Sequence, residues 1–326
     1  MTVNWQPTAT LTHLRQRADI LRKIRQFFYH RGLLEVETPT LCSATVTDPY
    51  LYSLSTEVTK APGETQTLYL QTSPEYCMKR LLAAGSGGIF QLCKAYRDDE
   101  MGIHHNPEFT MLEWYQPDFN HHQLMDDMDA LLQTVLPCGA AERVTYGELF
   151  RRYLAIDPHR CDVALLKQCA EKNNIIWHNA EGSQDKEDKD VWLQLLLSHC
   201  IEPHLGQEAP IFIYDYPASQ AALARIRDDD PPVAERFEVY FKGIELANGF
   251  HELVDAQEQR DRFCADLKKR AILNTAAVPL DEYFLAALGA GLPDCAGVAL
   301  GVDRLVMLAL GCDALADVLA FPLSHA

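Results

Sequence analysis

The sequence predicts an α+β fold in which helices flank an antiparallel β-sheet. Segments with strand character gather between residues 34 and 115 and again between 211 and 247, and the intervening chain is helical in pattern. A doubly wound parallel sheet would need strands and helices in strict alternation. The 326 residues are 48% apolar and 23% charged, which is typical of a globular protein.

The first expected element is a helix over residues 11–31, where apolar side chains recur at helical spacing. Gly32 is suited to end this helix, and residues 34–36 then read as a short strand that Pro39 stops. Three further strands are expected near residues 68–72, 89–93 and 109–115.

The middle of the chain, residues 121–205, is expected to be mainly helical because it carries two apolar stripes at helical spacing. The polar run 181–190 within it is typical of a solvated loop or a helix start. Beyond it we expect a strand at 211–214, strand character through 237–247, a charged helix over 255–274, a small-residue strand at 297–301 and an apolar helix from Asp303.

The charge balance argues against sequence-independent nucleic-acid binding. The chain has 29 Lys and Arg against 46 Asp and Glu, a net charge of −17, although a local basic patch stays possible. No basic leader and no bilayer-length apolar run is present, so we expect a cytoplasmic protein. The 10 cysteines include no Cys-x-x-Cys pair and are read as thiols rather than as a disulfide framework or a zinc site.

Residues 97–109 form the first segment with chemical character. They supply one arginine, four carboxylates, two imidazoles and a phenyl ring within 13 residues. One interpretation is a solvated hairpin loop. The other is a nucleotide loop, in which Arg97 holds a phosphate through paired hydrogen bonds and Phe109 offers a face to a base.

The second segment is 237–252, where Glu238, Glu245 and Glu252 lie among apolar and small residues. Two carboxylates together with nucleotide phosphates commonly hold Mg²⁺, and a third would suit a substrate ammonium group. Cross-strand ion pairs to Lys242 or Arg236 are the alternative.

The third segment is 297–304, in which glycines precede a helix and allow a ligand to approach the backbone. Arg304, in apolar surroundings, needs an anionic or aromatic partner. Asp303 alone could meet that need.

Together these segments resemble the three signature motifs of class II aminoacyl-tRNA synthetases, the first being the helix and strand that end at Pro39. Within that class the similarity is to the lysyl branch, and it runs colinearly from about residue 10 onward. It is carried by Ser73–Glu75, Met78–Leu81, His105–Glu113, Tyr216–Ala218 and Glu245–Glu252. The resemblance implies the class II catalytic core as a single domain over 1–326, with a mainly helical insertion at about 121–205, and a homodimer formed through the first motif.

Only about ten residues precede the first expected helix, so we expect no counterpart of the anticodon-reading β-barrel of lysyl-tRNA synthetases. In this the chain is similar to bacterial stand-alone paralogues, which use ATP and Mg²⁺ to activate (R)-β-lysine as an adenylate. They then transfer it to the ε-amino group of a lysine on elongation factor P. The alternatives are a truncated synthetase that charges tRNA and a non-catalytic regulatory paralogue. The missing anticodon-reading domain makes tRNA an unexpected partner. The lack of a bilayer-length apolar run makes membrane association equally unexpected.

The resemblance also implies a role for each matching residue. Arg97 would act on the α-phosphate and stabilise the charge that grows there, and Arg304 with Phe109 would stack on adenine. The rest of the nucleotide set is Asp98, Asp99, His105, Asn106, Glu245, Leu246 and Gly301. The diamine set is Ser73, Pro74, Glu75, Glu113, Tyr115, Asn248 and Glu252. Glu238 and Glu245 would bind Mg²⁺.

Three positions depart from the family pattern. Asp99 takes the place of the usual glutamate, which is displaced to Glu100, and His104 takes the place of an arginine expected on the γ-phosphate. Ala299 replaces the middle glycine of the third motif. Its methyl group would trim the amino-acid pocket, and we expect it to favour β-lysine over α-lysine.

Overall fold

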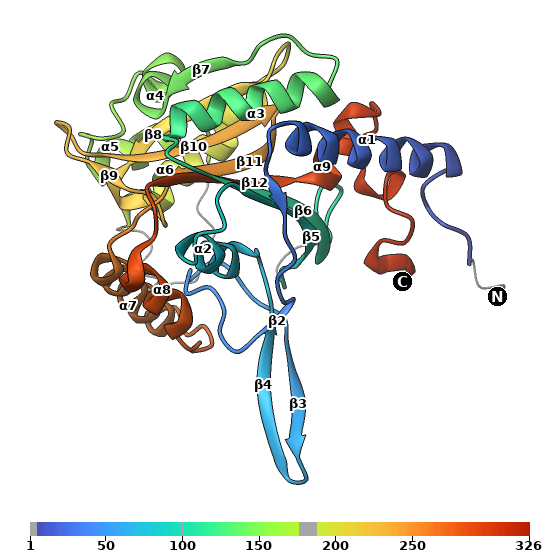
Figure 1. Cartoon of the computed structure of the whole chain (residues 1–326). Coiled ribbons are helices and arrows are strands. Elements are labelled where there is room, and N and C mark those ends of the chain that lie inside the picture. The colour runs from blue at the N-terminus through green and yellow to red at the C-terminus, as the bar shows by residue number, and fades with distance from the viewer. Residues whose placement is uncertain (1–4, 99–100, 176–187) are drawn as a thin grey trace. The chain divides into compact units, whose positions relative to one another are not determined.

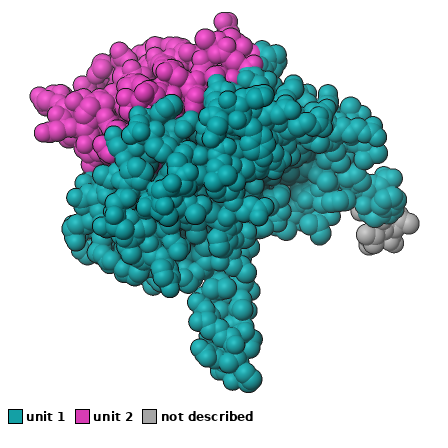
Figure 2. Space-filling model, in the orientation of Figure 1, with its two compact units in different colours: residues 1–119, 134–137, 253–326 teal, residues 120–133, 138–252 magenta. Residues whose placement is uncertain are grey.

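The computed structural model describes residues 5–98, 101–175 and 188–326 (Figure 1). The chain divides into two compact units (Figure 2). Unit 1 comprises residues 1–119, 134–137 and 253–326, and unit 2 comprises residues 120–133 and 138–252. The single catalytic domain inferred from the sequence stays a prediction.

Unit 1 is built on four strands in the order β1-β5-β6-β12. Their bounds are β1 Leu34–Glu35, β5 Ile89–Tyr96, β6 Glu108–Pro117 and β12 Cys295–Gly301. β6 pairs antiparallel with both β5 and β12, and only the short β1 pairs in parallel, with β5. The antiparallel arrangement expected from the sequence is confirmed for these strands.

One face of this sheet packs against helix α1 (Leu11–His30), whose first turn is capped by the Thr10 side chain. Phe28 of the helix lies 4.7 Å from the Phe90 ring and 5.0 Å from the Trp114 ring, between ring centroids. All three side chains are fully buried. Because side chains alternate along a strand, the neighbours of Trp114 on β6 point to the opposite face.

The remainder of unit 1 contains a second sheet and four helices. The sheet has the order β2-β4-β3, with β2 Leu41–Cys42, β3 Ser55–Ala61 and β4 Glu64–Leu70. Figure 1 shows the β3–β4 hairpin projecting from the other strands of unit 1. The helices are α2 Glu75–Ala83, α7 Ala256–Ile272, α8 Glu282–Gly291 and α9 Val302–Ala309. The expected charged helix and the final strand–helix pair are confirmed.

Unit 2 has its own four strands in the order β11-β10-β8-β7, with β9 pairing beside β10. Their bounds are β7 Glu142–Thr145, β8 Ile211–Pro217, β9 Ile226–Arg227, β10 Val233–Phe241 and β11 Ile244–His251. The strand character expected over 237–247 is confirmed, but it is divided between β10 and β11. The chain reverses at Lys242 and Gly243, whose φ angles of 55° and 73° suit the two-residue turn of a tight hairpin.

The helices of unit 2 confirm the helical character expected for 121–205, and they are interrupted by β7. They are α3 His121–Val135, α4 Tyr146–Leu154, α5 Val163–Lys172 and α6 Lys189–Leu196. Of the polar run 181–190, residues 181–187 lie outside the described residues, and Asp188 caps the start of α6. None of the helices in the described ranges has the length and apolar character that a membrane span requires.

Candidate active site

Arg97 and Phe109, the two residues expected to meet the nucleotide, lie together in unit 1. Arg97 directly follows β5, and its backbone N–H donates to the Pro107 carbonyl at 3.0 Å. Phe109 pairs with Ala95 across β5 and β6. The Arg97 guanidinium carbon lies 5.2 Å from the centroid of the Phe109 ring. A fork of N–H donors beside an aromatic face is an arrangement suited to a phosphate and a base.

The loop that follows Arg97 is tied to Arg304. Gly102 and His105 close a turn by backbone hydrogen bonds of 3.2 and 3.3 Å. Arg304 donates from Nη2 to His105 Nε2 at 2.6 Å and from Nε to the His104 carbonyl at 3.2 Å. The predicted contribution of Asp99 lies outside the described residues, while Asp98 is held by its N–H to the Tyr52 carbonyl at 2.9 Å.

Asn106 and His104 have partners that sequence reasoning missed. The Asn106 side chain donates to the Glu108 carbonyl at 2.5 Å and accepts from the Leu323 N–H at 3.0 Å. His104 Nε2 lies 3.2 Å from the Asp313 carbonyl oxygen. Nothing in the local pattern around residue 105 indicates these contacts with the end of the chain.

Asp303 does not serve Arg304, contrary to the simpler interpretation of the third segment. Its Oδ1 pairs with Arg17 Nη2 at 2.5 Å, and its Oδ2 accepts from the Thr110 N–H at 2.8 Å. Gly301 occupies the N-cap position of α9, where it ends β12 opposite Met111. Asp303 therefore fixes helix α9 against α1 and β6, and so fixes the position of Arg304.

A buried acidic network occupies the face of β6 that carries Phe109, because residues 109, 113 and 115 alternate with Trp114. Glu113 accepts from Ser73 Oγ at 2.7 Å and from the Tyr115 hydroxyl at 2.5 Å. Burial, followed by the nearby charge of Glu75, raises the pKa of Glu113 to about 7. Ala299 pairs with Glu113 across β12 and β6, so this departure from the family pattern lies beside the network.

Glu75 forms an ion pair that the sequence did not reveal. Its Oε1 accepts from Lys79 Nζ at 2.6 Å, one helical turn further along α2. Lys79 is 1% exposed, and removing the carboxylate partner of a buried charge of this kind is strongly destabilising. Pro74 takes the N-cap position of the same helix, and Ser73 Oγ accepts from the Glu75 N–H at 3.0 Å.

Ser73 and Glu75 also line a small cavity of about 30 Å³ in unit 1. Cys42 and Cys77 lie on its wall. That volume accommodates a few water molecules at most, so a diamine can bind here only if side chains move.

The remaining predicted residues lie in unit 2, on the β10–β11 hairpin. Glu238 pairs with Asn248 across the hairpin, and Tyr240 pairs with Glu245. Residues paired in this way point to the same face of a sheet. Arg236 donates to Glu238 at 2.5 Å and to Asn248 Oδ1 at 3.3 Å, so the ion pair considered as an alternative for Glu238 is present.

The Glu238 carboxylate accepts two further hydrogen bonds, from the hydroxyls of Tyr216 and Tyr240, both at 2.7 Å. A carboxylate offers about four lone-pair positions, so room for one more partner remains. Mg²⁺ in proteins is usually held by one or two carboxylates together with substrate phosphates. Glu238 and Glu245 fit such a site when a nucleotide completes it.

Leu246 and Glu252 complete the predicted set. Leu246 is buried within β11, and Glu252, directly after β11, is 1% exposed. The Glu252 backbone carbonyl accepts from Arg225 Nε at 2.9 Å. The hairpin thus presents glutamate and asparagine side chains in a rigid and largely buried setting.

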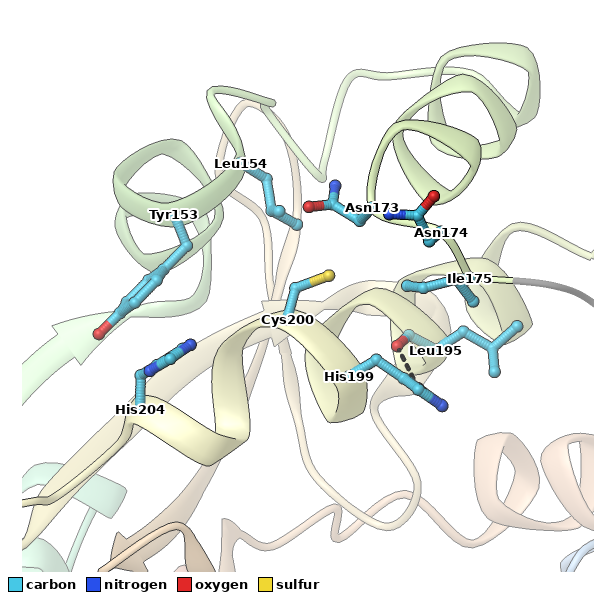
Figure 3. A pocket seen from close by; sticks show the side chains of 9 residues that line it. All are labelled: Tyr153, Leu154, Asn173, Asn174, Ile175, Leu195, His199, Cys200 and His204. Carbon is cyan, nitrogen blue, oxygen red and sulfur yellow. Dashed lines mark hydrogen bonds between the residues drawn. The ribbon is translucent and has the colours of Figure 1, made fainter.

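A larger cavity of about 770 Å³ in unit 2 contains none of the predicted site residues (Figure 3). Its lining comes from α4, the end of α5, α6 and the turns that follow. The lining residues are Tyr153, Leu154, Asn173, Asn174, Ile175, Leu195, His199, Cys200 and His204. His199 Nδ1 is engaged by the Leu195 carbonyl at 3.0 Å, and none of the lining residues in the described part of the chain is a carboxylate.

Comparison with known proteins identifies the family. A model described as tRNA synthetases class II (D, K and N) matches residues 3–325. The chain belongs to this class II synthetase family. Curated relatives named elongation factor P–(R)-β-lysine ligase come from Salmonella paratyphi B, Salmonella heidelberg and Salmonella enteritidis. Each is 55% identical over 327 aligned residues, which cover 100% of this chain and 99% of the relative. The α+β fold, the ligase class and the resemblance to the stand-alone ligases are confirmed.

Proposed function

We propose that this chain uses ATP to activate (R)-β-lysine and transfers it to the ε-amino group of a lysine on elongation factor P. The observation that carries the proposal is the single face of β6 that presents Phe109, Glu113 and Tyr115 in succession. One strand therefore carries both an aromatic ring that can stack on a base (Phe109) and a buried carboxylate that can bind an ammonium group (Glu113). The name of the relatives, which share 55% of their residues with this chain over its full length, supports the choice of substrates.

In the first half-reaction a carboxylate oxygen of β-lysine attacks the α-phosphorus of ATP. The bond to the bridging oxygen breaks, pyrophosphate leaves and β-lysyl-adenylate forms. Arg97 neutralises the charge that grows on the α-phosphate, and Arg304 and Phe109 hold the base. Glu238 and Glu245 would hold Mg²⁺, which would shield the phosphate charges.

In the second half-reaction the neutral amine of the acceptor lysine attacks the acyl carbon, and AMP leaves. No covalent enzyme intermediate is needed in either half. Glu75, Glu113 and Glu252 hold the ammonium groups of β-lysine, since a dication requires at least two anionic contacts. Positioning and charge neutralisation supply most of the rate enhancement.

The proposal extends to assembly and location. We expect a homodimer in the cytoplasm, formed through the helix and strand of the first motif. Several large apolar side chains of that region are exposed in the single chain, as an interface would require. They are Leu11, Tyr29 and Leu34.

The proposed activity separates from its two alternatives in one experiment. The protein is incubated with ATP, Mg²⁺ and either α-lysine or β-lysine, and pyrophosphate exchange is measured. Label transfer to elongation factor P or to tRNA is then followed. We expect exchange that is faster with β-lysine, and label on elongation factor P. Charging of tRNA would instead identify a truncated synthetase, and the absence of exchange would identify a regulatory paralogue.

The raised pKa of Glu113 predicts how diamine binding depends on pH. Below its pKa of about 7 the carboxyl is mostly protonated, and it attracts an ammonium group weakly. We therefore expect the dissociation constant of β-lysine to fall by up to about tenfold per unit as pH rises from about 5.5 to 7, and then to level off. The proton that Glu113 holds stabilises the fold at low pH, and this contribution is lost as pH rises through 7.

Isothermal titration calorimetry of the parent protein and of Glu113→Gln checks this expectation. The Gln variant should bind β-lysine weakly and with a flat pH profile. A parent affinity that does not change across this range would show that Glu113 has no role in binding the ammonium group.

A further inference from the structure

Three potential metal ligands meet in unit 2, among residues that the proposed reaction does not use. They are His121 at the start of α3, Glu235 in β10 and His251 at the end of β11. One ligand atom from each lies within 4.8 Å of the other two. Arg236 and Phe250 pair across the hairpin and share a face with Glu238. Because side chains alternate along a strand, their neighbours Glu235 and His251 point to the opposite face.

The local backbone brings these side chains to one point. Asn120 and Gln123 cap the start of α3 reciprocally, through side chain to backbone hydrogen bonds of 2.9 and 3.0 Å, and so fix His121. In the pairing of β8 with β10, Glu235 and Arg236 together stand opposite the single residue Asp215. Such a bulge redirects side chains, and bulges are frequent beside functional sites. The Asp215 backbone, with a φ of 58°, adopts the left-handed conformation here.

His121 is the observation that points to a ligand. It is 2% exposed, yet neither of its ring nitrogens has a hydrogen-bond partner among the residues that the structure describes. Asp215 Oδ1 lies 3.7 Å from Nε2, which is too far for a hydrogen bond. Leaving a buried imidazole unsatisfied costs about 1–3 kcal/mol, so such a group calls for an explanation.

The surrounding charges favour a cation. His251 Nδ1 contacts Glu235 Oε2 at 2.5 Å, and this hydrogen bond lowers the pKa of Glu235 below its usual range. Arg227 Nη2 lies 2.8 Å from Asp215 Oδ2, and Arg227 Nη1 lies 3.6 Å from Glu235 Oε1. Two carboxylates against one guanidinium leave the cluster with a net negative charge when the histidines are neutral. Arg227 also orients both carboxylates, as residues that hydrogen-bond to the ligands of a metal ion commonly do.

We propose that His121, Glu235 and His251 bind a zinc ion, with Asp215 or a water molecule as the fourth ligand. Two imidazoles and one carboxylate are a ligand set that zinc commonly takes. Donors about 2.1 Å from one tetrahedral zinc ion lie about 3.4 Å apart, and the ligand atoms here lie within 4.8 Å of one another, so shifts of about 1 Å or less in each side chain complete the site. The ion joins α3, β10 and β11, and it fixes His251 directly before Glu252.

Metal titration of the full-length protein tests the proposal. The protein is stripped with a chelator and titrated with Zn²⁺ against a chromogenic competitor, and separately with Co²⁺. We expect one ion per chain and the visible absorption of Co²⁺ bound to nitrogen and oxygen ligands. Glu235→Gln and His121→Ala should each weaken binding by about 100-fold. His204→Ala, which removes an exposed imidazole from the same unit, should bind as the parent does.

Two further measurements keep the result decisive. Because the chain has 10 cysteines, a Co²⁺ spectrum with thiolate charge-transfer bands would assign the ion to thiols and overturn the proposal. Zn²⁺ should raise the melting temperature of the parent and of His204→Ala but not that of Glu235→Gln. If His121→Ala does not fold, Glu235→Gln and the parent Co²⁺ spectrum decide. No binding by the parent, or equal binding by Glu235→Gln, would leave only a cluster of internal ion pairs.

Discussion

Replacing Arg97 with alanine is expected to slow β-lysine-dependent pyrophosphate exchange by about 10²–10³, because a positioned donor to the transition-state charge is lost. Arg97 directly follows β5, and its guanidinium already lies beside the Phe109 ring before the reaction begins. The loss should fall mainly on kcat, since the charge that Arg97 neutralises grows during attack on the α-phosphorus. Arg97→Lys keeps the charge but not the fork of donors, and we expect it to recover part of the rate.

Arg143→Ala is the matched control. Arg143 also lies over a phenyl ring, with its guanidinium carbon 5.5 Å from the Phe212 centroid, but it is outside the proposed site. Its removal should leave the exchange rate within about twofold of the parent, as surface changes usually do. If folded Arg97→Ala exchanged pyrophosphate as fast as Arg143→Ala, the phosphate role of Arg97 would be refuted.

The second large effect concerns stability. Asp303→Ala is expected to lower the free energy of unfolding by about 3–5 kcal/mol, because it leaves a buried cation without its counterion. Asp303 is 2% exposed, and the side chain of its partner Arg17 is 13% exposed. The same substitution removes the acceptor of the Thr110 N–H, which the Asp303 side chain binds at 2.8 Å. Urea unfolding followed by circular dichroism measures the change.

An exposed ion pair on α1, the helix that carries Arg17, provides the comparison. Asp19 and Arg22 lie 3.0 Å apart, with side chains 57% and 66% exposed. Solvent screens such pairs, so Asp19→Ala should not shift the urea midpoint measurably. Equal midpoints for Asp303→Ala and Asp19→Ala would mean that the Arg17–Asp303 pair does not hold α9 in place.

The spacing of apolar residues predicted much of the fold, because a helix or strand that buries one face carries apolar side chains at regular intervals. The apolar spacing of α1 is of this kind, and both α1 and β6 lie where the sequence placed them. Strand β4 overlaps the strand expected near residues 68–72. Its partner β3 escaped prediction because every residue of β3 is exposed, so no apolar alternation marks it. The turn at Lys242 and Gly243 was missed because apolar residues continue on both sides of it.

The candidate site shows the same division between local and distant information. Resemblance to known motifs indicated Arg97, Phe109 and Glu113, and the structure places these near or on one strand of unit 1. It could not indicate that Arg17 pairs with Asp303, which is 286 residues away. The His121 cluster was missed for the same reason, since its three ligands come from separate elements and share no short spacing in the sequence.

The intact mass of elongation factor P after incubation with this protein, ATP, Mg²⁺ and (R)-β-lysine tests the proposed function most directly. We expect a gain of one β-lysyl group on one lysine side chain, which disappears without ATP or with Arg97→Ala. Elongation factor P of unchanged mass, together with aminoacylated tRNA in a parallel reaction, would contradict it.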